Sequence, residues 1–126
     1  SSGELFRHLL GTGKIKVRIP EVNIHNAASV VLKTLSIEDQ IGLEHFIKSR
    51  DVTLSDREFI REYTLELLSR AIDKYDEVAF NSSKEAKDKL RSLPVYQVTK
   101  LIALHVKLDE RVKAALGQEA LNAFKP

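Results

Sequence analysis

The sequence predicts an α+β fold, mainly helical, in which a small N-terminal β-hairpin or meander packs on a bundle of about four helices. Three observations support this prediction. Charged and apolar residues alternate one by one over residues 14–19, which is the period of a half-buried strand. After Ser36, apolar residues recur every three or four positions, which is the period of an amphipathic helix. Three segments also begin with a serine followed three residues later by a carboxylate, a pattern typical of helix N-termini.

The β element is expected to cover about residues 14–35. Its first strand, residues 14–19, ends at Pro20, which has no backbone N–H for a β-ladder. A β-branched run at Val30 and Val31 predicts the second strand. A hairpin alone is at best marginally stable, so one face of it should pack on the helices. The first-strand residues expected on that face are Ile15, Val17 and Ile19.

Four helices are expected after the β element, over about residues 37–49, 56–80, 83–92 and 95–116. The first three begin after the capping serines Ser36, Ser55 and Ser82. The second is expected to be the longest, because its apolar stripe continues at helical spacing as far as Val78. Gly117 is placed to cap the fourth helix, because glycine readily adopts the left-handed conformation that commonly ends a helix.

Composition limits the range of functions. The chain has 126 residues, the size of one domain, and 43% hydrophobic residues are enough for one core but not for two independent ones. A net charge of +2, from 20 basic and 18 acidic residues, is too small by itself to imply a nucleic acid or an anionic membrane as the partner. Cysteine is absent, which excludes disulfides and cysteine zinc sites, and no apolar run approaches the roughly 20 residues that span a bilayer. We therefore expect no membrane partner and a cytoplasmic location.

No motif for catalysis or metal binding accompanies this architecture. The four histidines lie in separate predicted segments, and no two of them have the i, i+4 spacing of a zinc-binding helix. The glycines before Lys14 precede a strand rather than a helix, so they do not form a phosphate-binding loop. We therefore predict that the protein is not an enzyme, and we expect no catalytic residue, cofactor or metal.

Two rows of like charge stand out on the predicted helices. The first is a row of glutamates at i, i+4 spacing on the second helix: Glu58, Glu62 and Glu66. Such a row is mildly unfavourable unless cations lie nearby, and Arg61 and Arg70, within one turn, are expected to provide them. The second row is basic and lies on the third helix: Lys84, Lys87, Lys89 and Arg91. Local pairs with Asp88 and Glu85 predict that this helix is exposed and ion-paired.

Apolar residues near the chain ends are candidates for partner binding. Residues 1–13 are interpreted as a remnant of an expression tag followed by a short docking segment, which contains Leu5 and Phe6. Leu121 and Phe124 are the corresponding residues near the other end. Apolar residues at termini often dock on another chain, and docking on the same chain is the simpler alternative; we expect one or more protein partners, with self-association as one form of this.

A second candidate is the basic face of the first strand, which carries Lys14, Lys16 and Arg18. In the favoured interpretation, this strand has an edge open to pairing with a protein partner, and the chain is a non-enzymatic protein–protein interaction module. In the alternative, the three cations contact phosphates, and the chain is a nucleic-acid-binding domain. No aromatic residue lies between the cations, so single-stranded bases would have no stacking platform there.

The segment that joins the β element to the first helix has the sequence VVLKTLSIEDQIGLEHF, residues 30–46. Its order of strand, Leu-Ser and helix, after a short β element and before a helical body, resembles proteins that help to assemble bacteriophage tails and baseplates. The resemblance implies a non-enzymatic assembly factor or structural component, in the host cytoplasm or the virion. It identifies no individual functional residue.

Overall fold

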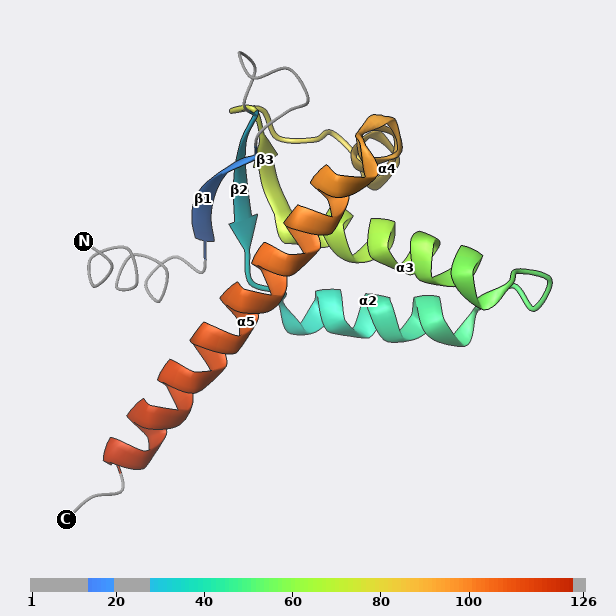
Figure 1. Ribbon diagram of the computed structural model, residues 1–126. Helices are drawn as coiled ribbons and strands as arrows, with labels where there is room; N and C mark the ends of the chain where they lie inside the picture. Colours follow the sequence, from blue (N-terminus) through green and yellow to red (C-terminus); the bar gives the residue numbers. More distant parts are fainter. Residues whose placement is uncertain (1–13, 20–27, 124–126) are drawn as a thin grey trace.

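The structure, a computed structural model, describes residues 14–19 and 28–123 (Figure 1). In chain order these residues form β1 (Lys14–Ile19), β2 (Ala28–Lys33), α2 (Ile37–Lys48), α3 (Asp56–Ala71), β3 (Ile72–Tyr75), α4 (Ser83–Ser92) and α5 (Val95–Ala123). The predicted fold class is confirmed: an α+β fold, mainly helical, with an N-terminal hairpin and four helices after it.

The three strands form an antiparallel sheet in the order β1-β2-β3, so β2 lies in the middle. β1 and β2 pair regularly from Lys14 opposite Lys33 to Ile19 opposite Ala28. α5 crosses beside the sheet, and the antiparallel pair α2–α3 extends away from it (Figure 1). The core lies between the sheet and the helices, and its buried members are Val30, Leu32, Leu65, Leu68, Ile72, Tyr75, Leu90, Leu101 and Leu108.

The expected helix over residues 56–80 is wrong at its end, where β3 follows α3 directly and pairs with β2. The pairing of β3 shifts by one residue in the middle of β2, which makes Asp73 the extra residue of a β-bulge. Because of this extra residue, Ile72 and Tyr75 both face the core although they lie three positions apart, and they are 5% and 6% exposed. The bulge therefore gives the buried residues of this strand the three-residue spacing of a helix. The sequence pattern alone cannot distinguish a bulged strand from a helix here.

A tight two-residue turn follows β3. Tyr75 donates a backbone hydrogen bond to Val78 at 2.9 Å, and Val78 donates to Tyr75 at 3.1 Å. Between them, Asp76 and Glu77 have φ values of 52° and 69°. Two successive residues at positive φ characterise a type I′ turn, for which Asn-Gly is the favoured sequence. Glutamate is a poor residue for this conformation, so the turn is strained at Glu77.

Changing this turn to Asn-Gly, by Asp76→Asn with Glu77→Gly, is expected to raise the free energy of unfolding by about 1 kcal/mol, because glycine adopts positive φ without a steric penalty. Urea unfolding followed by circular dichroism measures the change. The control is Asp51→Asn with Val52→Gly in the exposed connection between α2 and α3, where neither residue has a positive φ. An equal gain in the control would show that turn strain is not the cause.

The three predicted helix N-caps are confirmed. In each, a serine hydroxyl accepts a hydrogen bond from the backbone N–H three residues later: Ser36 from Asp39 at 3.0 Å, Ser55 from Glu58 at 3.2 Å and Ser82 from Glu85 at 3.1 Å. At Ser36 the capping box is complete, because the Asp39 carboxylate accepts from the Ser36 N–H at 3.1 Å. These caps fix where α2, α3 and α4 begin.

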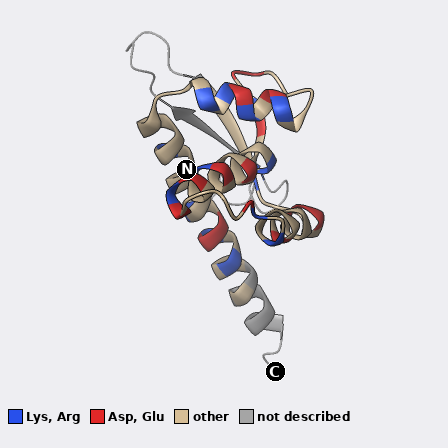
Figure 2. Cartoon of the chain, turned by 90° about the vertical axis from the view of Figure 1, so that its right-hand side faces the viewer, with Lys and Arg blue, Asp and Glu red and all other residues tan. Residues whose placement is uncertain are grey.

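α5 does not end near residue 116, and Gly117 is not its cap. The helix continues through Gly117 to Ala123. The residues that follow the glycine, Gln118 to Ala120, are strong helix formers, which offset the roughly 1 kcal/mol that an interior glycine costs. As a result, the C-terminal part of α5 projects away from the other helices in both views (Figures 1 and 2).

Candidate partner-binding surface

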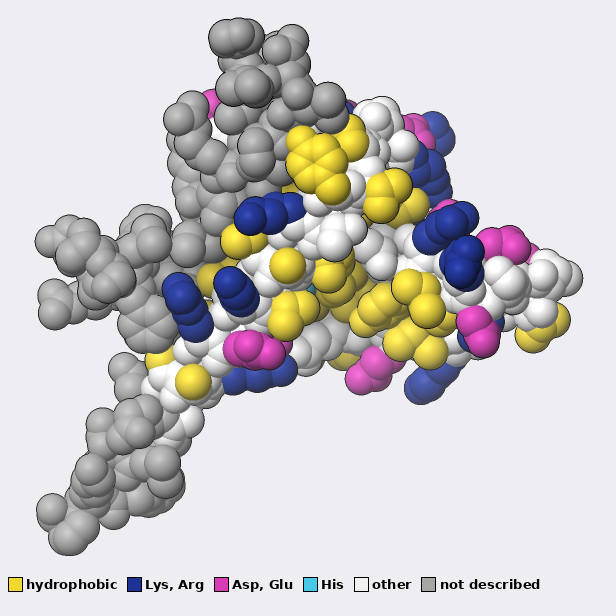
Figure 3. Space-filling model, in the orientation of Figure 1, with side chains coloured by type: hydrophobic (Ala, Val, Ile, Leu, Met, Phe, Trp, Pro, Cys, Tyr) yellow, Lys and Arg dark blue, Asp and Glu magenta, His cyan; other side chains and the backbone are white. Residues whose placement is uncertain are grey.

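α3, the end of α4 and the start of α5 enclose a groove of about 330 Å³ that opens to the surface, referred to below as the α3–α5 groove. Hydrophobic side chains gather on this side of α5, over the α2–α3 pair, with basic side chains beside them (Figure 3). Leu65 and Leu90 line the groove and also belong to the core, being 8% and 1% exposed. The groove is therefore a place where the hydrophobic core comes close to the surface.

Two threonines line the groove, but their hydroxyls are satisfied within their own helices. Thr64 donates to the backbone oxygen of Ile60 at 2.8 Å, and Thr99 donates to that of Val95 at 3.0 Å. A hydroxyl engaged in this way does not need a hydrogen-bond partner from a bound molecule. The two threonines therefore leave the groove mainly apolar, with Arg61 and Arg91 as its charged lining residues.

Two of the apolar residues that line the groove are strongly exposed to solvent. Ile60 and Val95, on facing walls, are 62% and 81% exposed. Scattered exposed apolar residues are common, but a contiguous apolar surface around a groove is typical of a binding site. Two other hollows differ from the groove because residues of both charges line them: Lys33 and Asp73 line one, and Arg50 and Asp51 line the other.

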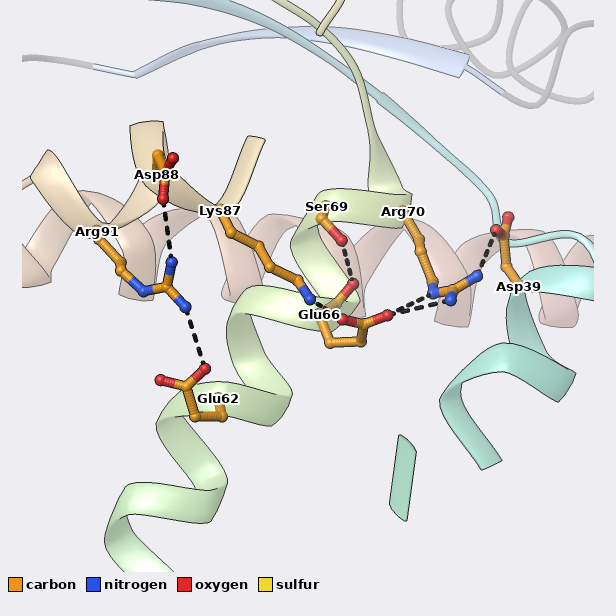
Figure 4. Close-up of polar contacts among 8 residues, drawn as sticks. All are labelled: Asp39, Glu62, Glu66, Ser69, Arg70, Lys87, Asp88 and Arg91. Carbon is orange, nitrogen blue, oxygen red and sulfur yellow. Dashed lines mark hydrogen bonds and ion pairs between the residues drawn. The ribbon is translucent and has the colours of Figure 1, made fainter. Parts of the chain in front are cut away.

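Ion pairs connect α2, α3 and α4 (Figure 4). The Glu66 carboxylate of α3 accepts hydrogen bonds from Arg70 Nε at 3.2 Å and Nη2 at 3.1 Å, and it also pairs with Lys87 of α4. Arg70 Nη1 donates to Asp39 of α2 at 3.4 Å. One chain of alternating charges therefore joins three helices.

Glu66 lies at the centre of this network and is only 7% exposed. Burial raises the pKa of its carboxyl, but the hydrogen bonds and charges of Lys87 and Arg70 outweigh burial and hold the pKa below the ordinary value. Gly42 of α2 leaves space for this arrangement, since a Cβ there would lie 2.5 Å from the Arg70 guanidinium. A larger residue at position 42 would therefore require the Arg70 guanidinium to move.

A second network joins α3 to α4 at the groove edge. Arg91 donates to Glu62 at 3.3 Å and to Asp88 at 3.2 Å, and Asp88 also accepts from Lys84 at 3.0 Å. Basic and acidic residues consequently lie next to one another over the helices (Figure 2). The expected pair of Lys84 with Asp88 is confirmed, whereas the Glu85 carboxylate accepts from the Asn81 N–H instead of pairing with Lys89.

Two members of the acidic row of α3, Glu66 and Glu62, are thus paired from α4, by Lys87 and Arg91 respectively. Of the two arginines expected to neutralise it, Arg70 does so through Glu66. Within residues 14–19 and 28–123, Arg61 takes part in no ion pair and lies instead on the wall of the α3–α5 groove.

Of the side chains predicted to bind a partner, only that of Lys14 is described. Lys14 is exposed at the start of β1 and pairs with Asp73 of β3 at 3.1 Å. Lys16 and Arg18 are opposite Val31 and Ser29 in the backbone register, and the backbone of Leu121 belongs to α5. Leu5, Phe6 and Phe124 lie outside the described residues. The structure does not bring Lys14 to the α3–α5 groove.

The sequence interpretation missed the residues of the groove because it assigned them to the core. Ile60 and Val98 fall on the apolar stripes of their helices, and such stripes usually face inward. A usable signal was the width of the stripe on α3: adjacent apolar residues at Phe59 and Ile60 lie about 100° apart around the helix, so the stripe covers more than one contact surface. Phe59 is half-buried and stacks on Phe46, 5.9 Å between ring centroids, whereas Ile60 is exposed.

Two histidines are described. His45 is exposed on α2, and His105 is 6% exposed on α5. Burial lowers the pKa of His105, partly opposed by the charge of Asp109. No three or more of the described His, Cys, Asp and Glu residues are grouped so that they could hold a metal ion.

The buried histidine predicts a pH dependence of stability. Because the unfolded chain binds the His105 proton more readily than the folded chain, the free energy of unfolding should fall as the pH drops below about 6.5, by at most about 1.4 kcal/mol per pH unit. Urea unfolding between about pH 5.5 and 7.5 tests this. His105→Phe should remove this part of the pH dependence, and an unchanged profile in the variant would contradict the assignment.

Within the described part of the chain, no helix is long and apolar enough to cross a membrane. Comparison with protein-family models, with curated proteins and with solved structures finds no match to this chain.

Proposed function

We propose that this protein is a non-enzymatic interaction module that binds a partner protein at the α3–α5 groove. The observation that carries the proposal is a preformed apolar groove whose edges hold two strongly exposed apolar side chains, Ile60 and Val95. Protein interfaces concentrate their binding energy in apolar side chains that enter such pockets. Burying the exposed edges would add roughly 25 cal/mol for each Å² of apolar surface removed from water.

The resemblance of residues 30–46 supports a more specific setting for this module. This segment forms the end of β2, the capped start of α2 and most of that helix. In that setting the protein is an assembly factor or structural component of bacteriophage tails or baseplates, and its partner is a protein of the same particle.

The nucleic-acid alternative has less support than the protein partner. It depends on Lys14, Lys16 and Arg18 of β1, and the charge of Lys14 is already neutralised in part by Asp73. Nucleic-acid binding requires several cations available to phosphates at once. The α3–α5 groove, in contrast, brings exposed Ile60 and Val95 together with a mainly apolar lining.

The test compares two double variants of the full chain as baits. Ile60→Glu with Val95→Glu places charges at the groove edge and should weaken partner binding roughly tenfold or more. Ile37→Glu with Val52→Glu, at positions that are 76% and 93% exposed away from the groove, should bind as the wild type does. Proteins retained from a lysate of the source organism are quantified by mass spectrometry, and the affinity of each purified protein that differs is then measured by calorimetry.

All four sites are exposed, so each substitution should change the free energy of unfolding by no more than about 0.5 kcal/mol. The proposal is contradicted if every retained protein binds the two double variants equally well. Light scattering of the same samples shows whether the partner at the groove is a second copy of the chain.

A further inference from the structure

The charged residues that line the α3–α5 groove are all basic among the described residues: Arg61 and Arg91. Arg91 forms ion pairs with Glu62 and Asp88, so its charge is partly neutralised. Arg57 lies one helical turn before Arg61 on the same face of α3. In the part of the chain that the structure describes, neither Arg57 nor Arg61 takes part in an ion pair. These two charges repel each other at i, i+4, and an acidic partner would relieve that repulsion.

The lining and volume of the groove indicate what kind of protein segment could bind there. Residues of α3 and of the start of α5 line it on two sides, and its lining is mainly apolar, because both threonine hydroxyls are bound to their own backbones and the arginines are its only charged members among the described residues. An amphipathic helix laid between two helices, with apolar side chains pointing down, is a recurring mode of recognition for such grooves. The volume of about 330 Å³ is near the lower limit for binding a whole small molecule, and it suits one or two apolar side chains.

A second copy of the chain fits this surface poorly. In a twofold dimer through the groove, the same surface of both copies would meet, so the positive charges of Arg57 and Arg61 would be present on both sides of the interface. Juxtaposed like charges oppose association. We infer that the occupant of the α3–α5 groove is an acidic amphipathic helix of a different protein, with apolar residues at i, i+3 or i, i+4 and Asp or Glu beside them. This inference rests on the proposed function.

Two synthetic helical peptides test the inference directly. Both carry the same leucines at i and i+4 in an alanine-rich helix, with glutamate at the flanking positions in one peptide and lysine in the other. Each is titrated into the 15N-labelled full chain, and backbone amide shifts are followed by NMR. The acidic peptide should perturb Ile60, Thr64 and Thr99, and it should bind roughly tenfold or more tightly than the basic peptide at low salt, with the difference shrinking as salt is added.

Variants locate the charges that matter. Arg61→Glu should lower the affinity for the acidic peptide roughly tenfold. Lys48→Glu makes the same change of net charge on α2 and should leave that affinity at the wild-type value. Ile60→Glu with Val95→Glu should abolish the groove shifts for both peptides.

Several results would overturn the inference. Equal or tighter groove binding by the basic peptide would exclude the acidic partner while leaving an apolar protein-binding groove intact. If neither peptide shifts the groove amides, or if Arg61→Glu and Lys48→Glu weaken the acidic peptide equally, the acidic helix is not the occupant. Concentration-dependent dimerisation abolished by Ile60→Glu would identify a second copy as the occupant instead. In each of these cases the comparison of baits under Proposed function still shows separately whether the groove binds a protein.

Discussion

Replacing Glu66 with alanine is expected to lower the free energy of unfolding by about 2–4 kcal/mol, measured by urea unfolding near neutral pH. The Glu66 side chain is 10% exposed and accepts hydrogen bonds from Arg70 while pairing with Lys87. Both cations are partly buried, with side chains 29% and 24% exposed, so removal of the carboxylate leaves two poorly hydrated positive charges near each other. The loss therefore includes the cost of uncompensated charge as well as the lost hydrogen bonds.

Glu62→Ala is the matched control, one helical turn earlier on the same acidic row. Glu62 pairs with Arg91, and the two side chains are 42% and 48% exposed, so water and salt already screen the pair. Its loss should cost about 0.5 kcal/mol or less. Similar costs for the two variants would show that burial of Glu66 does not strengthen its ion pairs.

The sequence was sufficient for the parts of the fold that local chemistry determines. Alternation over residues 14–19 defined β1, and serine caps at Ser36, Ser55 and Ser82 defined the starts of three helices. A cap is visible in sequence because its partners lie three residues apart. The strand is visible because its alternation is regular over six residues.

The end of α3 could not be predicted in the same way, because tertiary pairing decides it. Ile72 and Tyr75 continue an apolar spacing of three, which a helix also produces. β2 offers a strand edge with buried Val30 and Leu32, and the bulge at Asp73 lets both residues join that core. The competing helix would leave the β2 edge unpaired on this side, a cost that no local pattern shows.

The candidate site was also beyond the reach of local patterns, because residues from three helices form it. The row of glutamates and the row of cations were both visible in the sequence. Their pairing across helices, of Lys87 with Glu66 and of Arg91 with Glu62, was not. Nor does the sequence show that Arg61 lines the groove. Exposure of Ile60 likewise depends on where α5 crosses α3, which the sequence does not state.

Leu90→Ala should have two separable effects, because Leu90 belongs to the core and also lines the α3–α5 groove. It is 1% exposed, so the change leaves a cavity and should lower the free energy of unfolding by about 3 kcal/mol in urea unfolding. It also removes part of the groove floor, which should weaken binding of the acidic leucine peptide several-fold at a temperature where the variant is fully folded.

Leu68→Ala separates these effects, since Leu68 is 0% exposed in the same core but does not line the groove. Its cost in stability should be similar, about 3 kcal/mol, while peptide binding should stay at the wild-type value. If both variants weaken the peptide equally, binding depends on general core packing and not on contact with the floor. If only Leu90→Ala weakens it, the side chain that enters the groove reaches the core itself, and the apolar floor is part of the recognition site.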